Sequence, residues 1–395
     1  MTKSGKSVEV IKPSVLYFGP RGLQGGIGGS ARVRNMLDVL SKLQANTELI
    51  SYLPEKKFRI TRQQINDYLN TTTISVPASS SKIIKASALL QILRYGLKYI
   101  KKADILFAHS PGIVYGFPAL LLAKTFQKPL LIDLTDSKDH DTPKFIYNSV
   151  LKNSKVVFTV SRYLVEVAKR AGCRNVVHTP GFIDGDAFKS NVAARERVRK
   201  ELGIGSGEVV IGYSGAFSAI EGLSYLIRAF KNLPDQYEGA KLVLLGGRNV
   251  VGSEDIPQLI NELCLSERVI LVPPQPYELV PEYLSAFDIA CSPKVDCEEN
   301  RAADPIRVYE YMSVGLPTIA SAMGETANVI ENGRDGFLVK PGDEDDLARV
   351  LGHVIQNLDS LQELKRRARE KVIKGYSQQA VIGTIRRVFD ELSVI

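Results

Sequence analysis

An arginine and a glutamate lie three positions apart in the segment DPIRVYEYMSVGLPTIAS, residues 304–321. In a helix, this spacing puts Arg307 and Glu310 on one face. The two side chains could form a surface salt bridge worth about 0.2–0.5 kcal/mol. They could instead bind a ligand, because a guanidinium can bridge phosphate oxygens and a carboxylate can accept hydrogen bonds from two hydroxyl groups.

Glycines form a second candidate site, in the segment GGIGGS at residues 25–30, which follows an apolar run ending at Gly19. Glycine-rich loops let backbone N–H groups approach an anion at a helix N-terminus, so Gly28 and Gly29 are binding candidates. A structural turn explains them equally well. The loop lacks the dinucleotide-binding spacing, and the chain contains no GxxxxGK[ST] motif, so neither a dehydrogenase nor a P-loop kinase is supported.

The elements that must position these residues alternate along the chain. Apolar, β-branched and aromatic runs predict strands at residues 14–19, 104–109, 129–134 and 156–161, and then at 209–215, 241–247, 268–272, 288–293 and 317–321. Helical patterns separate them. Two successive series of this kind predict an α/β protein with two Rossmann-like parallel-sheet domains facing each other across a cleft.

Composition limits the classes of protein to consider. The chain is 44% hydrophobic and 24% charged, which is typical of a globular protein. Its four cysteines form no CxxC pair, and no N-terminal segment resembles a signal peptide, so we expect a cytoplasmic location. The longest apolar stretch, residues 112–123, is shorter than the roughly 20 residues needed to cross a bilayer.

Positive charge is concentrated in the first half of the chain. Residues 1–182 hold 27 Lys and Arg against 11 Asp and Glu, whereas residues 183–395 hold 24 against 32. Within the basic half, residues 81–102 combine apolar residues at a helical period with six basic ones. This pattern is typical of a helix on the anionic inner face of a membrane, and equally of a core-packed helix with a solvated basic face.

Several motifs together suggest a family. They are GGIGGS, VSRYLVEVAKRAG (160–172), HTPGFIDGDAF (178–188), GYSGAFSAIEGLSYLIRAF, EYLSAFDIACSP and, most specifically, PIRVYEYMSVGLPTIAS followed by NGRDGFLVKPGDEDDLA. With these motifs the chain resembles, over nearly its whole length, the retaining GT-B glycosyltransferases of family 4, or glycosyl transferases group 1. The resemblance implies an acceptor held by the N-terminal domain and a nucleotide-diphosphate sugar held mainly by the C-terminal one, with no bound metal or other cofactor.

The resemblance also implies roles for individual residues in donor binding. Glu310 would accept hydrogen bonds from the ribose hydroxyls, and Arg307 would lie beside the donor phosphates. Further donor-binding candidates are Gly28, Gly29, Gly215, Lys294 and Arg301. The chain departs from the family where Ala216 and Glu221 replace the usual arginine and lysine, and where Ala302 replaces the first of two paired glutamates. We expect Arg307 to compensate for the missing positive charges.

The catalytic candidates that the resemblance implies lie at or just after the ends of predicted strands of the first domain. Asp133 and Asp136, in LLIDLTD, would orient a sugar hydroxyl or stabilise an oxocarbenium-like transition state. His109 ends the neighbouring strand 104–109 at the same sheet edge. The alternatives are a loop or N-cap aspartate and a structural histidine. The residues at 139–141, Asp-His-Asp, could imitate a metal site, but no strand-end DxD accompanies them, and we expect no metal.

We therefore expect a retaining glycosyltransferase that moves a sugar to a glycan or lipid-linked acceptor in the synthesis of a cell-surface polysaccharide or glycoconjugate. An acceptor-side domain would span residues 1–182, a nucleotide-sugar domain residues 183–375, and a helix at 376–395 would cross back to the first domain. We expect no nucleic-acid partner. The alternatives are a catalytically silent GT-B subunit of another transferase and, more weakly, a nucleotide-sugar epimerase.

Overall fold

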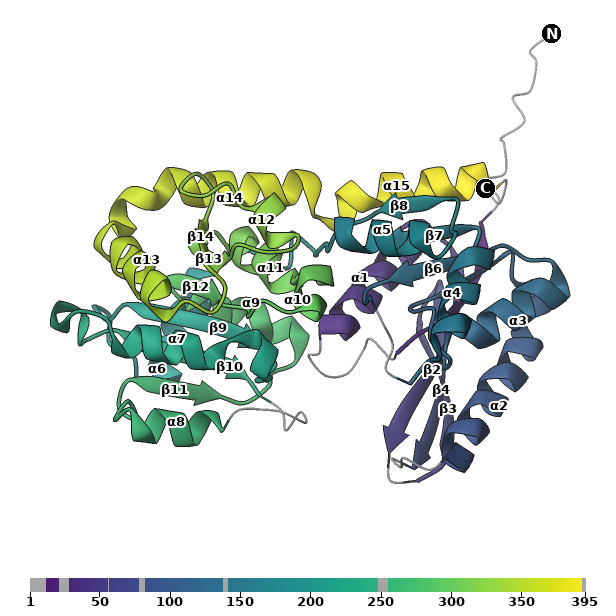
Figure 1. Cartoon of the computed structure of the whole chain (residues 1–395), viewed down its shortest axis with the longest axis horizontal. Helices are drawn as coiled ribbons and strands as arrows, with labels where there is room; N and C mark the ends of the chain where they lie inside the picture. Colours follow the sequence, from purple (N-terminus) through teal and green to yellow (C-terminus); the bar gives the residue numbers. More distant parts are fainter. Residues whose placement is uncertain are drawn as a thin grey trace, which may run out of the picture.

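The computed structural model describes residues 12–20, 28–55, 57–77, 82–137, 141–247 and 255–392 of the 395-residue chain. It has two α/β domains, one built from the purple-to-blue half of the chain and the other from the green-to-yellow half (Figure 1). The predicted residues Gly25, Gly26, Asp139 and His140 lie outside the described ranges. The prediction of two parallel-sheet α/β domains is confirmed.

The N-terminal domain contains an eight-stranded sheet in the order β3-β4-β2-β1-β5-β6-β7-β8. Every pairing in it is parallel except that of β3 with β4. Its strands are β1 (Ser14–Phe18), β2 (Asn46–Glu55), β3 (Arg59–Asn66), β4 (Leu69–Pro77), β5 (Ile105–Ala108), β6 (Leu130–Leu134), β7 (Val156–Thr159) and β8 (Val176–His178). Its helices are α1 (Gly28–Lys42), α2 (Lys82–Tyr99), η1 (Ile100–Lys102), α3 (Gly116–Phe126), α4 (Lys144–Asn153) and α5 (Arg162–Arg170).

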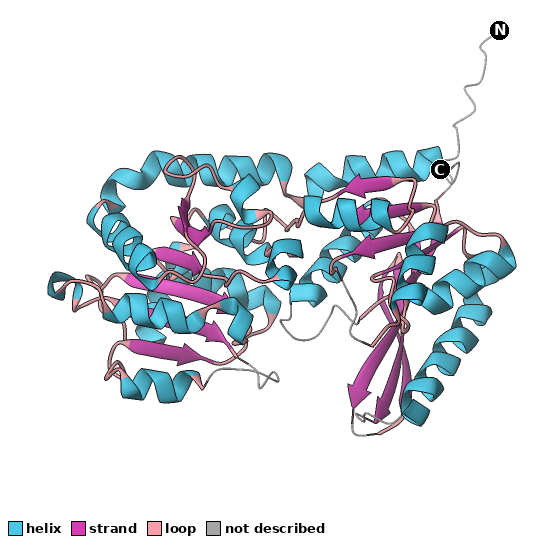
Figure 2. Ribbon diagram, in the orientation of Figure 1, coloured by secondary structure: helices cyan, strands magenta, loops and turns pink. Residues whose placement is uncertain are grey.

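Alternate strand residues of this sheet pack against helices on both faces, as Figure 2 shows. Leu16 and Phe18 of β1 face one core with α2, α3, α4 and α5, while Val15 and Tyr17 face another with α1. This alternation follows from the two-residue period of a strand. It explains why the central strands read as continuous apolar runs in the sequence.

The C-terminal domain contains a six-stranded parallel sheet in the order β11-β10-β9-β12-β13-β14. The strands are β9 (Val210–Gly215), β10 (Lys241–Gly246), β11 (Val269–Val272), β12 (Ile289–Ser292), β13 (Thr318–Ser321) and β14 (Phe337–Val339). The helices are α6 (Val192–Glu201), α7 (Leu223–Lys231), α8 (Ile256–Glu262), α9 (Val280–Ser285), α10 (Glu298–Ala302), α11 (Ile306–Val314), α12 (Thr326–Val329), α13 (Glu344–Gln356) and α14 (Gln362–Gly375). Short 3₁₀ turns are η2 (Ala219–Glu221), η3 (Asp235–Tyr237), η4 (Tyr277–Leu279) and η5 (Leu358–Leu361).

The last helix, α15 (Gln378–Glu391), follows the C-terminal domain in sequence but lies on the N-terminal domain (Figure 1). Its apolar residues Ile385 and Phe389 are buried in the same core as Val33 and Met36 of α1. At its start, the side chain of Gln378 donates to Asn35 at 3.2 Å and accepts from Lys42 at 2.5 Å. The chain therefore crosses between the domains twice, which ties α1 to the C-terminal segment.

Helix α2 packs against the sheet through one face only. Ala88 and Ile92 are buried, whereas Leu90 and Leu97 are 66% and 52% exposed on a surface that also carries exposed basic residues. The helix therefore combines the core-packed face that one interpretation of the sequence expected with an exposed apolar and basic face. Within the described ranges, no helix is long and apolar enough to cross a membrane.

Candidate functional site

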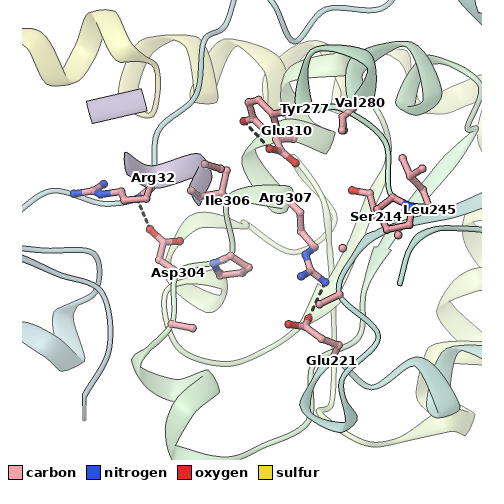
Figure 3. Close-up of a pocket in the computed structure, with 18 of the residues that line it drawn as sticks. Arg32, Ser214, Glu221, Leu245, Tyr277, Val280, Asp304, Ile306, Arg307 and Glu310 are labelled. Atoms are coloured by element: carbon pink, nitrogen blue, oxygen red, sulfur yellow. Dashed lines mark hydrogen bonds and ion pairs between the residues drawn. The ribbon is translucent and has the colours of Figure 1, made fainter. Parts of the chain in front are cut away.

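A pocket of about 330 Å³ lies between the two domains, at the carboxyl ends of strands from both sheets. Ligands of parallel α/β sheets bind at this edge. The N-terminal domain contributes the start of α1 and residues that follow β6 and β7, while the C-terminal domain contributes residues at the ends of β9, β10 and β12 and the start of α11. Figure 3 shows the labelled side chains around this space, with Arg307 and Glu310 on the same side of it.

Arg307 lines the pocket from the first turn of α11. Its Nη1 donates to the hydroxyl of Tyr213 at 2.6 Å and to Oε2 of Glu221 at 2.7 Å, and its guanidinium lies 4.8 Å from the centre of the Tyr213 ring. Burial disfavours the charge of Arg307, but Glu221 together with the hydroxyl groups of Tyr213 and Tyr311 outweighs that effect and raises its pKa. Arg307 is therefore a fixed cation on the pocket wall.

Glu221, where the family has lysine, pairs with two cations. Besides Arg307, it accepts from Nζ of Lys294 at 3.2 Å, and Lys294 donates also to Asn300 at 2.8 Å. Burial raises the pKa of Glu221, but Arg307 and Lys294 together lower it below its usual value. Burial lowers the pKa of Lys294. The pocket wall therefore contains two cations and an anion.

Glu310 lines the pocket one helical turn after Arg307. Its Oε1 accepts a hydrogen bond of 2.9 Å from the hydroxyl of Tyr277, and burial raises its pKa to about 7. Across the domain boundary, the guanidinium of Arg34 in α1 lies 4.8 Å from the centre of the Tyr277 ring and 3.0 Å from Glu278. Arg307 and Glu310 have different partners, so the interpretation of a surface salt bridge between them is wrong.

Asp304 is a third carboxyl in the pocket wall and is half-buried. It accepts from the backbone N–H of Gly181 at 2.5 Å and from the hydroxyl of Tyr309 at 2.7 Å. Burial raises its pKa to about 7. Because Gly181 precedes the crossing into the C-terminal domain, Asp304 joins the two domains beside the pocket.

Two of the predicted catalytic residues belong to a buried ion pair. Asp133 accepts from Nε and Nη2 of Arg32 at 3.0 and 2.8 Å, and Nδ1 of His109 lies 3.6 Å from its Oδ2. Burial raises the pKa of Asp133, but Arg32 and His109 together lower it well below its usual value. Neither Asp133 nor His109 lines the pocket, whereas Arg32 does. Their geometry is that of residues that position Arg32.

Asp136 lines the pocket on the N-terminal side and is exposed. Its carboxylate accepts a hydrogen bond of 2.8 Å from Thr135, and its backbone carbonyl accepts one of 2.7 Å from Tyr147. The side chain therefore faces the ligand space opposite the C-terminal domain, and of the three predicted catalytic residues only Asp136 has access to that space.

The remaining predicted donor residues lie in different places. Gly215 lines the pocket with a φ of +148°, and a Cβ there would lie 2.6 Å from Nη2 of Arg307, so glycine allows Arg307 its position. Gly28 and Gly29 are the first two residues of α1. Arg301 is exposed, pairs with Asp296 at 2.7 and 2.8 Å, and does not line the pocket. The structure therefore does not bring Arg301 to the donor site.

Sequence reasoning missed several pocket residues that act through contacts distant in sequence. They are Arg32, Arg34 and Asp304. For Asp304, the position just before the PIRVYEY block was an available signal. No spacing indicated the ion pair of Arg32 with Asp133. Among the described residues, no group of three His, Cys, Asp or Glu side chains could hold a metal ion.

Comparisons with known proteins agree with this geometry. Residues 194–371 match the family model described as glycosyl transferases group 1. A D-inositol 3-phosphate glycosyltransferase from Corynebacterium jeikeium is 28% identical over 268 residues, which cover 65% of this chain and 62% of that protein. Its counterpart from Nocardia farcinica is 28% identical over 213 residues, 53% of this chain and 46% of that one. The chain thus matches about half to three fifths of the length of these relatives.

Solved structures extend the likeness to both domains. Sucrose-phosphate synthase from Thermosynechococcus elongatus superposes with a TM-score of 0.78 at 16% identity, over 96% of this chain and 99% of that one. HepE from Anabaena, solved in complex with UDP, superposes with a TM-score of 0.75 at 16% identity, over 96% and 100% of the two chains. The chain has the two-domain GT-B fold, and its residues 194–371 are similar to the glycosyl transferases group 1.

Proposed function

We propose that this protein is a glycosyltransferase that moves a sugar, with retention and without a metal ion, from a nucleotide-diphosphate sugar to a glycan or lipid-linked acceptor. The observation that carries the proposal is the interdomain pocket with Arg307 and Glu310 on one face of α11. A guanidinium suits the diphosphate and a buried carboxylate suits the ribose hydroxyls. HepE, a neighbour in fold, was solved with UDP and also with UDP-glucose.

The roles of the two sides of the pocket follow from this proposal. Arg307 and Lys294 hold the phosphates, Glu310 holds the ribose, and Asp136 faces the sugar from the N-terminal domain. Asp133 and His109 hold Arg32, which lines the pocket beside Ala31. The negative charge of the Asp136 carboxylate would stabilise an oxocarbenium-like transition state.

For the acceptor and the location, we propose a lipid-linked substrate at the inner face of the membrane, in the synthesis of a cell-surface polysaccharide or glycoconjugate. Support comes from neighbouring helices of the N-terminal domain, α2, α3 and α4, which expose Leu90, Leu97, Leu121 and Phe145. The exposed basic residues Arg94, Lys98 and Lys124 lie on the same helices. Apolar side chains interleaved with basic ones suit an anionic lipid surface.

A catalytically silent subunit is the second candidate, because Glu221 offsets one of the two cations near the donor phosphates. One experiment separates the two: the purified protein is incubated with UDP-, GDP- and ADP-linked sugars, and release of the nucleotide is followed with and without EDTA. A transferase releases nucleotide from one donor, and EDTA has no effect. Binding without release favours the silent subunit, and a loss of activity in EDTA that manganese restores contradicts metal independence.

A further inference from the structure

The part of the pocket that we propose to bind the donor phosphates contains a negatively charged side chain, that of Glu221. Glu221 lines the pocket and uses both carboxylate oxygens, Oε1 for Lys294 and Oε2 for Arg307. The side chains of all three residues are at most 14% exposed. Two cations and one anion leave this cluster with a net charge of +1.

The backbone around Glu221 is held from two sides, so the carboxylate cannot easily leave the cluster. The carbonyl of Ile220 accepts from the side chain of Asn300 at 2.7 Å and from the N–H of Val295 at 3.2 Å. Gly222 has a φ of +72°, and a Cβ there would lie 2.0 Å from the carbonyl oxygen of Pro293. Glycine thus lets the loop of Glu221 pack directly against the loop of Lys294.

Both cations keep hydrogens for a ligand while they are paired with Glu221. Within the described part of the chain, Arg307 makes its hydrogen bonds through Nη1 alone, which leaves Nε and Nη2. Lys294 donates two of its three ammonium hydrogens, one to Glu221 and one to Asn300. A phosphate can therefore join the cluster while Glu221 remains in it.

We propose that Glu221 is a fixed counter-anion that weakens the hold of this site on the free nucleoside diphosphate and so promotes product release. The inference rests on the proposed function. When the acceptor oxygen bonds to the sugar, the bond from the sugar carbon to the β-phosphate oxygen breaks, and that oxygen keeps the electron pair. The acceptor hydroxyl loses its proton to water. The product therefore carries one more negative charge than the sugar nucleotide, and Glu221 repels it more strongly.

The test is Glu221→Gln, which keeps the shape of the side chain and removes its charge. Isothermal titration uses UDP, GDP and ADP, each with its nucleoside and its glucose conjugate, on both proteins. We expect the diphosphate that binds to gain about tenfold or more in affinity, because the carboxylate beside the proposed phosphate position would no longer repel it. Its glucose conjugate should gain less, and its nucleoside should not change.

A purely structural role for Glu221 makes the opposite prediction. If it only held Arg307 in place, Glu221→Gln would bind the diphosphate as weakly as the wild type or more weakly, and that result overturns the inference. Failure of every diphosphate to bind either protein overturns the proposed function and the inference with it. The matched control is Glu278→Gln, which removes one negative charge from a 70% exposed side chain paired with Arg34. Its diphosphate affinity should change less than about twofold.

Thermal unfolding keeps the test decisive if the variant is less stable. Without the carboxylate, Arg307 and Lys294 face each other uncompensated, so the ligand-free variant should unfold at a lower temperature than the wild type. Inorganic pyrophosphate, which lacks base and ribose, should then raise the unfolding temperature of Glu221→Gln more than that of the wild type. An equal or smaller rise contradicts the proposed repulsion.

Discussion

The hydroxyl of Tyr277 donates a hydrogen bond of 2.9 Å to Oε1 of Glu310. The carboxylate proposed to bind ribose is therefore already oriented by a neighbour, and its second oxygen faces a pocket that both domains line. Arg34 of α1 lies over the Tyr277 ring. Through Tyr277 and Arg34, the carboxylate of Glu310 is therefore connected to the N-terminal domain.

Glu310→Gln should lower the affinity for the nucleotide and remove the preference for ribose over 2′-deoxyribose, because an amide oxygen accepts hydroxyl hydrogen bonds less strongly than a carboxylate does. Competition between the donor nucleotide and its 2′-deoxy form measures the preference. Tyr277→Phe is the control, since it keeps the carboxylate and should retain the preference. Equal discrimination by wild type and Glu310→Gln would remove Glu310 from the ribose.

Arg307→Ala should weaken nucleoside diphosphate binding by about tenfold or more, since charge-assisted hydrogen bonds contribute about 1.5–3 kcal/mol. Nucleoside binding should change little because the proposed contact is to phosphate. Arg301→Ala offers a matched control: this arginine lies six positions earlier, is exposed and pairs with Asp296. Titration calorimetry that found equal losses for diphosphate and nucleoside in Arg307→Ala would refute the assignment.

Much of the fold was predictable because the central strands are buried on both faces. β1, β5, β6, β7 and β9 to β13 all overlap runs that the sequence predicts. By contrast, no strand was predicted for residues 46–77, where β3 is polar and largely exposed and β4 is rich in threonine. β8 and β14 have only three residues each, too few to show a period.

The sequence predicted site residues only where they lie close together in one segment. Arg307 and Glu310 belong to one helix, so spacing and motif were sufficient to propose them. Asp133 looked catalytic because it lies near the end of a predicted strand, but its partner Arg32 lies 101 positions away, and only the folded chain brings the two together. The pairing of Glu221 with Lys294 and Arg307 likewise joins loops that are 73 and 86 positions apart.

Asp133, near the end of β6, and Asp136, just after it, should respond differently to replacement by asparagine. Asp133→Asn leaves the buried guanidinium of Arg32 without its counter-charge and should cost about 3–5 kcal/mol of unfolding free energy. Asp136→Asn changes an exposed side chain, so its stability should remain within about 0.5 kcal/mol while kcat falls. Urea unfolding and a transfer assay check both. An unchanged kcat in Asp136→Asn would exclude Asp136 from the reaction.

Two pocket carboxyls should make stability depend on pH. Burial raises the pKa of Asp304 and of Glu310 to about 7. Each therefore holds a proton in the folded state that the unfolded chain releases above about pH 4. The unfolding free energy should fall as pH rises from there to about 7, by up to about 1.4 kcal/mol per pH unit for each group, and then level off.

Asp304→Asn should make this decline shallower, because the amide does not titrate. Chemical unfolding at several values between about pH 5 and about pH 8 measures the slope. Asp235→Asn, at an exposed position in η3, should retain the wild-type slope. If Asp304→Asn kept that slope too, the decline would have to come from other groups.

The exposed face of α2 should bind anionic lipid. Leu90 and Leu97 are exposed beside Arg94 and Lys98, and η1 continues the surface with Lys101 and Lys102. Each basic residue near an anionic leaflet contributes about 1 kcal/mol, and salt screens the attraction. Replacing Lys98, Lys101 and Lys102 with glutamate should reduce cosedimentation with anionic liposomes and leave nucleotide affinity unchanged.

Three exposed lysines of the C-terminal domain supply the control for this charge reversal. Replacing Lys231, Lys340 and Lys374 with glutamate changes the net charge by the same amount, and liposome binding should stay near that of the wild type if α2 is the contact. Leu97→Ser should weaken binding further at high salt, where the apolar contribution remains after the charges are screened. If the wild-type protein fails to sediment with anionic vesicles even at low salt, the α2 surface does not bind lipid, and an acceptor in solution or on a protein becomes the better proposal.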